Sequence, residues 1–198
     1  MPETIRSFIA IELNEAIRSA LANTQCRLKK LDCYIKWVNP ENMHITLKFL
    51  GNIEIKTLNA IKEIIKKTTS NTCTIPFELT QIGIFPNTES PRIIWSGINE
   101  PAGMLKVQSD SLNEKLAELG IPKEKKEFNP HITIGRVKSN KNIRKFIKIL
   151  KEPLITPGIK QSASHITLFK STLTPMGARY EVLTKIKISP IYLTNKYI

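Results

Sequence analysis

The sequence predicts an α+β protein with two lobes that face each other across a shared groove. Strand-like and helix-like segments alternate along the 198 residues without a low-complexity linker. His-Ile-Thr followed by an aliphatic residue occurs at residues 44–47 and again at residues 131–134, which is 87 residues later (131 − 44). A helical pattern follows each copy within a few residues. This arrangement indicates a weak internal duplication in which each lobe contributes one such strand.

The first half has the order strand, helix, strand, strand, helix, strand, strand, helix. Apolar and β-branched runs predict strands at residues 6–13, 34–38, 43–50, 74–84 and 92–97. Asn14 is a suitable N-cap for the first helix, and aliphatic residues at helical spacing predict the second. The predicted helices are residues 15–30, residues 54–67, and a third that opens at Pro101 and ends at Gly120.

The second half repeats this plan. The second His-Ile-Thr strand precedes a basic helix near residues 140–150, and further strands are expected near residues 155–160, 164–169 and 179–187. The tail over residues 188–198 is apolar, and we expect it to add a strand or to cover a lobe. A hydrophobic content of 41% is enough for a normal core in one large domain or two small lobes.

The charge balance favours an anionic partner. Thirty Lys and Arg against 17 Asp and Glu give a formal net charge of +13, and the pI is about 9.7. Such a surface attracts a polyanion, and RNA is the natural candidate. An AT-rich genome would also enrich Lys, Ile and Asn, so charge alone leaves the partner open.

Cysteine content and the N-terminal segment exclude several classes of protein. The three cysteines are odd in number and lack C-x-x-C spacing, so we expect neither a disulfide framework nor a zinc site. Glu12 interrupts the short apolar stretch near the N-terminus, and no signal peptide or transmembrane span is visible. We therefore predict a cytoplasmic protein without a membrane partner.

The two His-Ile-Thr motifs suggest a reaction. On a strand, His44 and Thr46 share one face, and His131 and Thr133 do the same. A cleft with two imidazoles and two hydroxyls suits phosphodiester cleavage without a metal, since one His takes a proton, the other gives one, and the Thr hydroxyls hold phosphate oxygens. A single copy would mean little, because His and Thr are ordinary residues on a half-buried strand. The third histidine, His165, also lies in a His-Ile-Thr-Leu segment but lacks the nearby Asn-Pro, and we interpret it as a structural or solvent-facing residue.

Many further segments occur in an order that resembles the 2H phosphoesterase superfamily. Within it, the chain resembles the RNA 2′,3′-cyclic phosphodiesterase family, which is also called the 2′-5′ RNA ligase family. The similar segments are residues 6–11, 37–38, 44–51, 83–86, 91–97, 128–136, 168–173 and 177–180. The only departure among them is Ala178, where the family often has Pro.

The resemblance implies a bilobal 2H phosphoesterase fold, with two antiparallel sheets flanked by helices around a central cleft and a pseudo-two-fold duplication. It implies that residues 1–198 form a single bilobal domain and that the enzyme hydrolyses an RNA terminal 2′,3′-cyclic phosphate to a 2′-phosphate. In the family's usual assignment His44 is the proton donor and His131 the proton acceptor, although chemistry alone does not rank them. Thr46 and Thr133 would bind phosphate oxygens. We expect no metal or other cofactor, a monomer, and substrates such as tRNA halves or short oligonucleotides.

Other residues around the motifs have two competing interpretations each. Arg136 matches the family motif and is a candidate phosphate ligand, but strict strand alternation places it on the face away from His131. Lys48 shares the His44 face by the same rule, which suggests charge at the cleft edge. The loop with Lys123, Lys125 and Lys126 is expected to be solvated rather than to guide RNA. Phe85 and Trp37 are expected to pack in the core rather than to stack on a base.

Competing functions come from other classes. Thr is a poor ligand for the metals that His favours, which argues against a metal-dependent hydrolase. The absence of G-x-x-x-x-G-K-[ST] argues against a nucleotide-dependent kinase or ligase. Two alternatives stay open: joining of a 2′,3′-cyclic phosphate to a 5′-hydroxyl as a 2′-5′ linkage, and a non-catalytic basic RNA-binding module.

Overall fold

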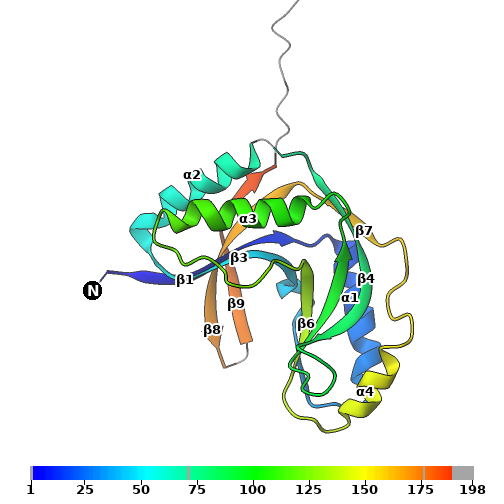
Figure 1. Cartoon of the computed structure of the whole chain (residues 1–198). Helices are drawn as coiled ribbons and strands as arrows, with labels where there is room; N and C mark the ends of the chain where they lie inside the picture. The colour runs from blue at the N-terminus through cyan, green and yellow to red at the C-terminus, as the bar shows by residue number, and fades with distance from the viewer. Residues whose placement is uncertain (1, 71, 176, 189–198) are drawn as a thin grey trace, which may run out of the picture.

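The structure, a computed structural model, describes residues 2–70, 72–175 and 177–188 (Figure 1). This part of the chain contains nine strands and four α-helices. The strands are β1 (Thr4–Glu12), β2 (Ile35–Trp37), β3 (His44–Glu54), β4 (Ile75–Phe85), β5 (Ile93–Asn99), β6 (His131–Val137), β7 (Lys160–Ala163), β8 (His165–Thr174) and β9 (Gly177–Lys187). The helices are α1 (Glu15–Lys29), α2 (Leu58–Thr69), α3 (Met104–Ala117) and α4 (Ile143–Ile149), with short 3₁₀ turns at Pro40–Asn42 and Ile55–Thr57.

Most predicted elements are confirmed, and one is wrong. The strand expected at residues 155–160 does not form, because Pro157 and Gly158 make a turn in which Gly158 has φ +86°. Strand β7 therefore begins at Lys160. The predicted basic helix is shorter than expected, because Asn142 before its first residue adopts the left-handed conformation. The apolar tail lies almost entirely outside the described residues, so the expectation for it stays a prediction.

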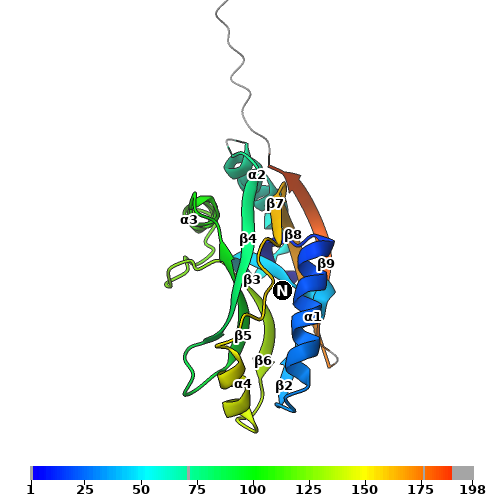
Figure 2. The same ribbon diagram turned by 90° about the vertical axis from the view of Figure 1, so that its right-hand side faces the viewer.

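The sheet has the strand order β7-β4-β5-β6-β3-β1-β8-β9, with β2 added beside β6. Every pairing is antiparallel, and β3 and β6 meet at one residue pair, Ile45 with Ile132. From this pair outward, β3-β1-β8-β9 form lobe 1, and β6-β5-β4-β7 together with β2 form lobe 2 (Figures 1 and 2). The two sheets expected from the resemblance are thus halves of one curled sheet, and the α+β bilobal fold is confirmed.

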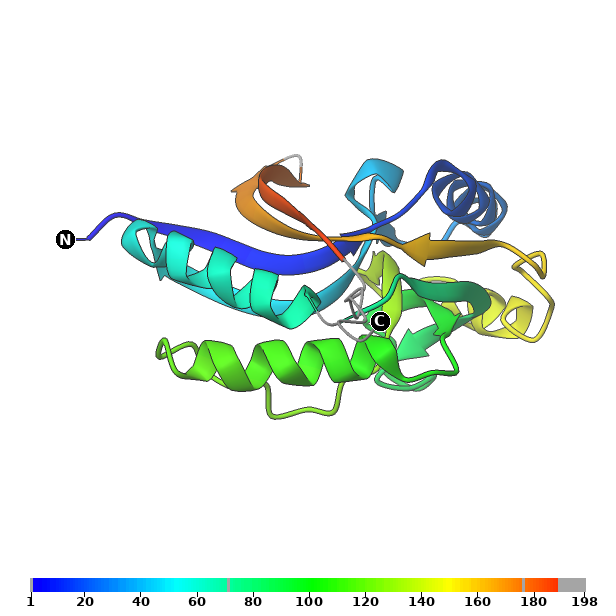
Figure 3. The ribbon, with the colours of Figure 1, turned by 90° about the horizontal axis from the view of Figure 1, so that it is seen from above.

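The duplication is visible in the chain order. Each half contains a strand, a helix, a His-Ile-Thr strand and a second helix, as β1-α1-β3-α2 and as β5-α3-β6-α4. The first helix of each half crosses to the other lobe. Helix α1 contacts β6 and β7 of lobe 2, whereas α3 packs beside α2 and against β3 of lobe 1 (Figure 3). Each lobe is therefore covered in part by a helix from the other half of the sequence.

Both His-Ile-Thr strands are anchored in the core by their aliphatic residues. Ile45, Leu47, Ile132 and Ile134 are all at most 2% exposed and belong to one large cluster. Burial of such side chains contributes about 1.5–3 kcal/mol each, so the strands are fixed from the side opposite their polar residues. The alternating pattern therefore orients the His and Thr side chains toward the opposite face of the sheet.

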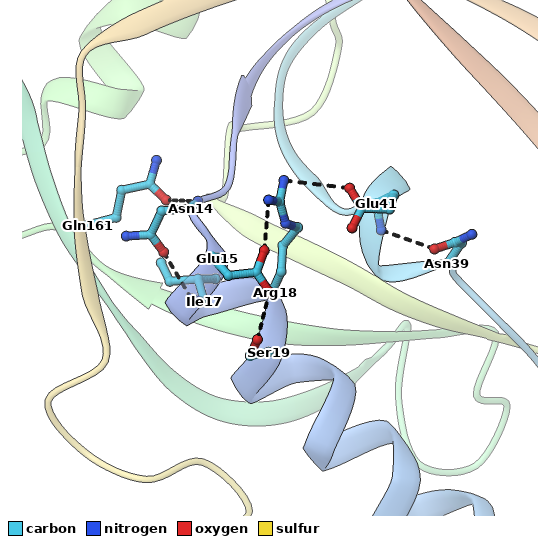
Figure 4. A network of polar contacts seen from close by, with 8 residues as sticks. All are labelled: Asn14, Glu15, Ile17, Arg18, Ser19, Asn39, Glu41 and Gln161. Carbon is cyan, nitrogen blue, oxygen red and sulfur yellow. Dashed lines mark hydrogen bonds and ion pairs between the residues drawn. The ribbon is translucent and has the colours of Figure 1, made fainter.

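The segment that leads to His44 is held by a polar network at the start of α1 (Figure 4). Asn14 caps the helix as predicted, since its Oδ1 accepts the Ile17 N–H at 2.9 Å. Arg18 on the first turn of α1 forms ion pairs with Glu15 at 2.9 Å and with Glu41 at 3.7 Å. Glu41 belongs to the 3₁₀ turn immediately before β3, so this contact connects α1 to the entry of the first His-Ile-Thr strand.

Candidate active site

A cleft of about 660 Å³ lies where the two lobes meet. His44, Thr46, His131 and Thr133 all line it. The structure therefore brings together the four residues predicted from the two motifs. His165 lies on β8 outside the cleft, where its Nδ1 is 2.9 Å from Ser164 Oγ, as expected for a residue without a role in this site.

The two histidines are held in the same way. His44 Nδ1 is 2.8 Å from the Asn42 carbonyl, and His131 Nδ1 is 2.8 Å from the Asn129 carbonyl. Because a carbonyl only accepts hydrogen bonds, each Nδ1 carries the proton, and each Nε2 is left to exchange a proton with a ligand. The structural counterpart of Asn129 is thus Asn42. The Asn39 side chain instead caps the 3₁₀ turn by accepting the Glu41 N–H at 3.1 Å.

The central residue pair sets the positions of the four side chains. In an antiparallel ladder, pairing of Ile45 with Ile132 places His44 opposite Thr133 and His131 opposite Thr46. This register brings the His and Thr side chains of both lobes to the same cleft. Neither Thr hydroxyl is hydrogen-bonded within the described part of the chain, so both can donate to a bound group.

The surroundings of the two histidines differ. The His44 ring stacks on Phe8 with centroids 4.7 Å apart and meets the edge of Tyr180 at 5.4 Å. The pKa of His44 is lowered to about 4, mainly by burial and also by the charge of His131, while the hydrogen bond to the Asn42 carbonyl opposes the shift. His131 has one aromatic neighbour among the described residues, Phe85, at 5.4 Å.

Arg136 lines the cleft, so the alternation that turned it away from His131 is wrong. The pairing of β5 with β6 shifts between Ile94 and Trp95, which pair with Gly135 and Thr133. Ile134 has no partner in β5 and forms a β-bulge, which resets the alternation. Arg136 consequently emerges on the same face as Thr133.

The prediction that Lys48 lies at the cleft edge is also wrong. Strand β1 pairs Ile9 with Lys48 and Ala10 with Thr46, so Leu47 forms the equivalent bulge in β3. Lys48 is turned away from the cleft and is 2% exposed. Its Nζ donates to Asn113 Oδ1 at 2.7 Å and to the Pro122 carbonyl at 2.6 Å. Burial lowers its pKa, and Glu124 opposes this effect.

The cleft has a positive lining. Lys36, Arg136 and Arg179 line it, and no carboxylate does so among the described residues. Lys36 pairs with Arg136 across β2 and β6, and none of the three cations forms an ion pair within the described residues. Burial raises the pKa of the Tyr180 hydroxyl, and the charges of Arg136 and Arg6 oppose that rise, in keeping with the position of Tyr180 beside Arg136 in the cleft.

The remaining predictions concern aromatic and loop residues. Phe85 stacks on Trp95 with centroids 4.8 Å apart and contacts His131, while Trp37 packs against the core and also lines the cleft. Lys123 forms an ion pair with Glu114, and none of Lys123, Lys125 and Lys126 lines the cleft. The sequence reasoning missed Lys36, Phe49 and Arg179 as cleft residues. The pairings that place them, β2 with β6, β1 with β3 and β8 with β9, join distant segments and are not visible in local patterns.

Comparison with known proteins agrees with this site. The family model described as LigT like Phosphoesterase matches residues 11–95 and 99–180, which include both His-Ile-Thr strands. The chain belongs to the LigT-like phosphoesterase family. The resemblance to 2H phosphoesterases noted in the sequence is thereby confirmed. As a phosphoesterase of this family, the protein presents the paired motifs on the inner strand of each lobe.

Several curated relatives carry the name RNA 2′,3′-cyclic phosphodiesterase. The protein from Methanocaldococcus jannaschii is 39% identical over 181 residues, which cover 90% of this chain and 98% of the relative. The protein from Thermotoga maritima is 34% identical, with coverage of 90% and 93%.

Among solved structures, the Thermus thermophilus protein TT0787 has a TM-score of 0.79 at 26% identity, with coverage of 95% and 100%. Escherichia coli LigT in its apo form has a TM-score of 0.74 at 22% identity, with coverage of 94% and 99%, and shares the fold.

Among the described residues, no group of three or more His, Cys, Asp or Glu side chains is placed to hold a metal ion. No helix in the same part of the chain is long and apolar enough to cross a membrane.

Proposed function

We propose that this phosphoesterase hydrolyses the terminal 2′,3′-cyclic phosphate of RNA to a 2′-phosphate without a metal ion. One observation carries the proposal: two imidazole Nε2 atoms and two free Thr hydroxyls line a cleft that contains cations and no carboxylate among the described residues. The curated relatives with the name RNA 2′,3′-cyclic phosphodiesterase support the choice of substrate. Cytoplasmic location, the monomeric state and tRNA halves as substrates stay predictions.

The proposed reaction needs one proton acceptor and one proton donor. His131 takes a proton from water as its oxygen forms a bond to phosphorus, and the bond from phosphorus to the 3′-oxygen breaks in line. His44 gives its Nε2 proton to the leaving 3′-oxygen. Thr46 and Thr133 donate hydrogen bonds to the non-bridging oxygens, where negative charge grows in the transition state. Proton exchange with solvent then restores both imidazoles.

The pKa of His44 bears on this assignment. At neutral pH a group with a pKa of about 4 is unprotonated in the free protein, whereas a donor must carry its proton. A bound phosphodiester brings a negative charge beside His44 and raises its pKa, so we propose that substrate binding protonates the donor. The reversed assignment, with His44 as the acceptor, would need no such change.

Substitution of sulfur for the leaving 3′-oxygen separates the two assignments. A thiolate leaves without protonation far more readily than an alkoxide, because a thiol has a pKa of about 8.5. If His44 is the donor, His44→Ala regains activity on the 3′-thio substrate, whereas His131→Ala stays inactive. Rescue of His131→Ala instead would reverse the roles.

The orientation of the substrate follows from equivalent positions in the two strands. Phe49 and Arg136 each lie five residues after the motif His, and both line the cleft. Phe49 is 58% exposed. We place the terminal nucleobase against Phe49, since aromatic faces stack on bases, and the cyclic phosphate toward Arg136, since its guanidinium pairs with phosphate oxygens.

The test uses a short RNA that ends in a 2′,3′-cyclic phosphate, incubated with the protein in EDTA. The expected product is the 2′-phosphate, identified by its position, and His44→Ala and His131→Ala serve as controls. Activity that EDTA abolishes and a divalent ion restores would contradict the metal-free mechanism. Binding of RNA without turnover in all conditions would favour a non-catalytic RNA-binding module, and addition of a 5′-hydroxyl RNA shows whether the same preparation forms 2′-5′ linkages.

A further inference from the structure

Both bulges next to the motif threonines are contacted by buried polar side chains from the crossing helices. Ser109 Oγ on α3 donates to the Leu47 carbonyl at 2.7 Å. Gln25 Nε2 on α1 donates to the Ile134 carbonyl at 2.8 Å. Ser109 is 6% exposed and Gln25 is 2% exposed. Leu47 and Ile134 are the bulged residues that directly follow Thr46 and Thr133.

The two contacts arise at equivalent places in the duplicated fold. On α1 the buried residues Leu21, Thr24, Gln25 and Leu28 follow the spacing i, i+3, i+4, i+7. On α3 the buried residues Leu105, Gln108, Ser109 and Leu112 follow the same spacing. Gln25 and Ser109 therefore occupy corresponding positions, each on a helix that has crossed from the other lobe's half of the sequence. Their side chains differ, but both donate to the carbonyl of the bulged residue in the His-Ile-Thr strand that they contact.

The extra residue of a bulge is unpaired in the ladder beside it, and a buried carbonyl without a hydrogen bond is unfavourable. Ser109 supplies a donor to the Leu47 carbonyl, whereas the Ile134 carbonyl accepts both the Gln25 amide and a backbone N–H. Gln25 Nε2 also donates to the Val38 carbonyl at 2.8 Å, and the Val38 N–H donates to the Ile134 carbonyl at 3.0 Å, so β2 is joined to the bulge of β6. A donor at this point fixes the peptide that immediately follows the motif threonine.

We propose that Ser109 and Gln25 are positioning residues for the phosphate-binding threonines, with Ser109 acting on Thr46 and Gln25 acting on Thr133. The proposal rests on the proposed function, in which both hydroxyls bind phosphate oxygens. Each helix thus sets the hydroxyl of the lobe against which it packs. A purely structural role would lower stability alone, whereas a positioning role makes each residue's effect depend on its own threonine.

A double-mutant cycle tests this dependence. Ser109→Ala removes one oxygen and leaves the helix intact; Gln25→Met keeps the length and removes the amide. Each is combined with Thr46→Val and with Thr133→Val, and kcat and KM are measured well below the melting temperature of every variant. We expect Ser109→Ala to lower kcat roughly tenfold, because small displacements of reacting groups are costly. The same change should have an effect of less than about twofold when Thr46 is already Val, and should keep its tenfold effect beside Thr133→Val.

Gln25→Met should also lower kcat. Its effect should disappear when Thr133 is already Val and persist when Thr46 is Val. Ser109→Thr restores the hydroxyl and should recover most of kcat. Equal losses of kcat beside both threonine variants would overturn the proposal. If Gln25→Met does not fold, the cycle with Ser109→Ala decides alone, since it contains both the matched and the mismatched threonine.

Turnover by the wild-type protein separates this proposal from the proposed function. If the wild-type protein does not hydrolyse the cyclic phosphate, the proposed function fails. The same set of variants is then compared by their affinity for inorganic phosphate, measured by calorimetry. Ser109→Ala should then weaken phosphate binding roughly threefold, and the effect should vanish beside Thr46→Val alone. Unchanged phosphate affinity in Ser109→Ala would overturn the positioning role.

Discussion

The two His-Ile-Thr strands have the same backbone and different neighbours. Each bears His and Thr on the cleft face, a bulge at the following aliphatic residue, and a carbonyl bonded by a crossing helix. Beyond the bulge they diverge. Lys48 is buried in lobe 1 where Gly135 lies in lobe 2, and Phe49 lines the cleft where Arg136 does so in lobe 2.

Under the proposed function, the divergence gives one duplicated scaffold two imidazoles with different surroundings. A proton donor and a proton acceptor must start the reaction in opposite protonation states, and unlike neighbours bias which histidine holds the proton. Here aromatic rings enclose His44, and burial lowers its pKa to about 4. The duplicated backbone sets the geometry, and the unlike neighbours set the chemistry.

The largest expected effect comes from removal of either imidazole. His44→Ala and His131→Ala should each lower turnover of the cyclic phosphate by roughly two to four orders of magnitude, the usual range for a positioned proton-transfer group. His165→Ala is the matched control, because it lies in the same tripeptide outside the cleft. A His165 variant as inactive as the other two, with a normal fold, would show that the wrong pair had been chosen.

Removal of a single hydroxyl should have the next largest effect. Thr46→Val and Thr133→Val keep the shape and the strand propensity, and we expect kcat to fall roughly ten to a thousandfold as an oxyanion donor is lost. Serine at either position should recover part of the rate. Similar kinetics for wild type and both Val variants would mean that these residues serve the strand alone.

The lowered pKa of the half-buried His44 also predicts a pH dependence of stability. The folded pKa of about 4 lies below the ordinary value of 6.5, so the unfolded chain binds more protons between these values. The free energy of unfolding should therefore fall as pH drops from about 6.5 to 4, by roughly 2–3 kcal/mol in total. Urea unfolding at several pH values measures this, and His44→Gln should lack the contribution. Parallel curves for the two proteins would show that burial does not control this histidine.

Phe49 and Arg136 give the smallest expected effects and the sharpest contrast between the lobes. Arg136→Gln should raise KM for a cyclic mononucleotide roughly tenfold, because it loses a phosphate contact. Phe49→Leu should raise KM for the same compound roughly fivefold through weaker stacking on the base. Cyclic ribose phosphate without a base separates them, since it should still respond to Arg136→Gln and should ignore Phe49→Leu. An equal response of both substrates to Phe49→Leu would remove the base from that side of the cleft.

Local patterns predicted the strands, most helices and the four motif side chains, because period-two alternation is a property of a few neighbouring residues. The same rule failed for Arg136 and Lys48. A bulge depends on how a strand pairs with another segment far away in sequence, as Thr46 pairs with Ala10 and Thr133 with Trp95. The reason for a glycine at position 135 is likewise visible only in the fold. A Cβ there would lie 3.0 Å from the Ile35 side chain and 3.2 Å from the Trp37 side chain.

The cleft has no carboxylate among the described residues that line it, and under the proposed function this has a consequence for the end of the catalytic cycle. The cyclic substrate carries one negative charge, whereas a phosphate monoester carries about 1.5 to 2 near neutral pH. Lys36, Arg136 and Arg179 therefore attract the product more strongly than the substrate. We expect departure of the 2′-phosphate to limit the steady-state rate, so that moderate salt speeds kcat while it raises KM. A pre-steady-state burst, which disappears as salt increases, is the kinetic sign of such retention.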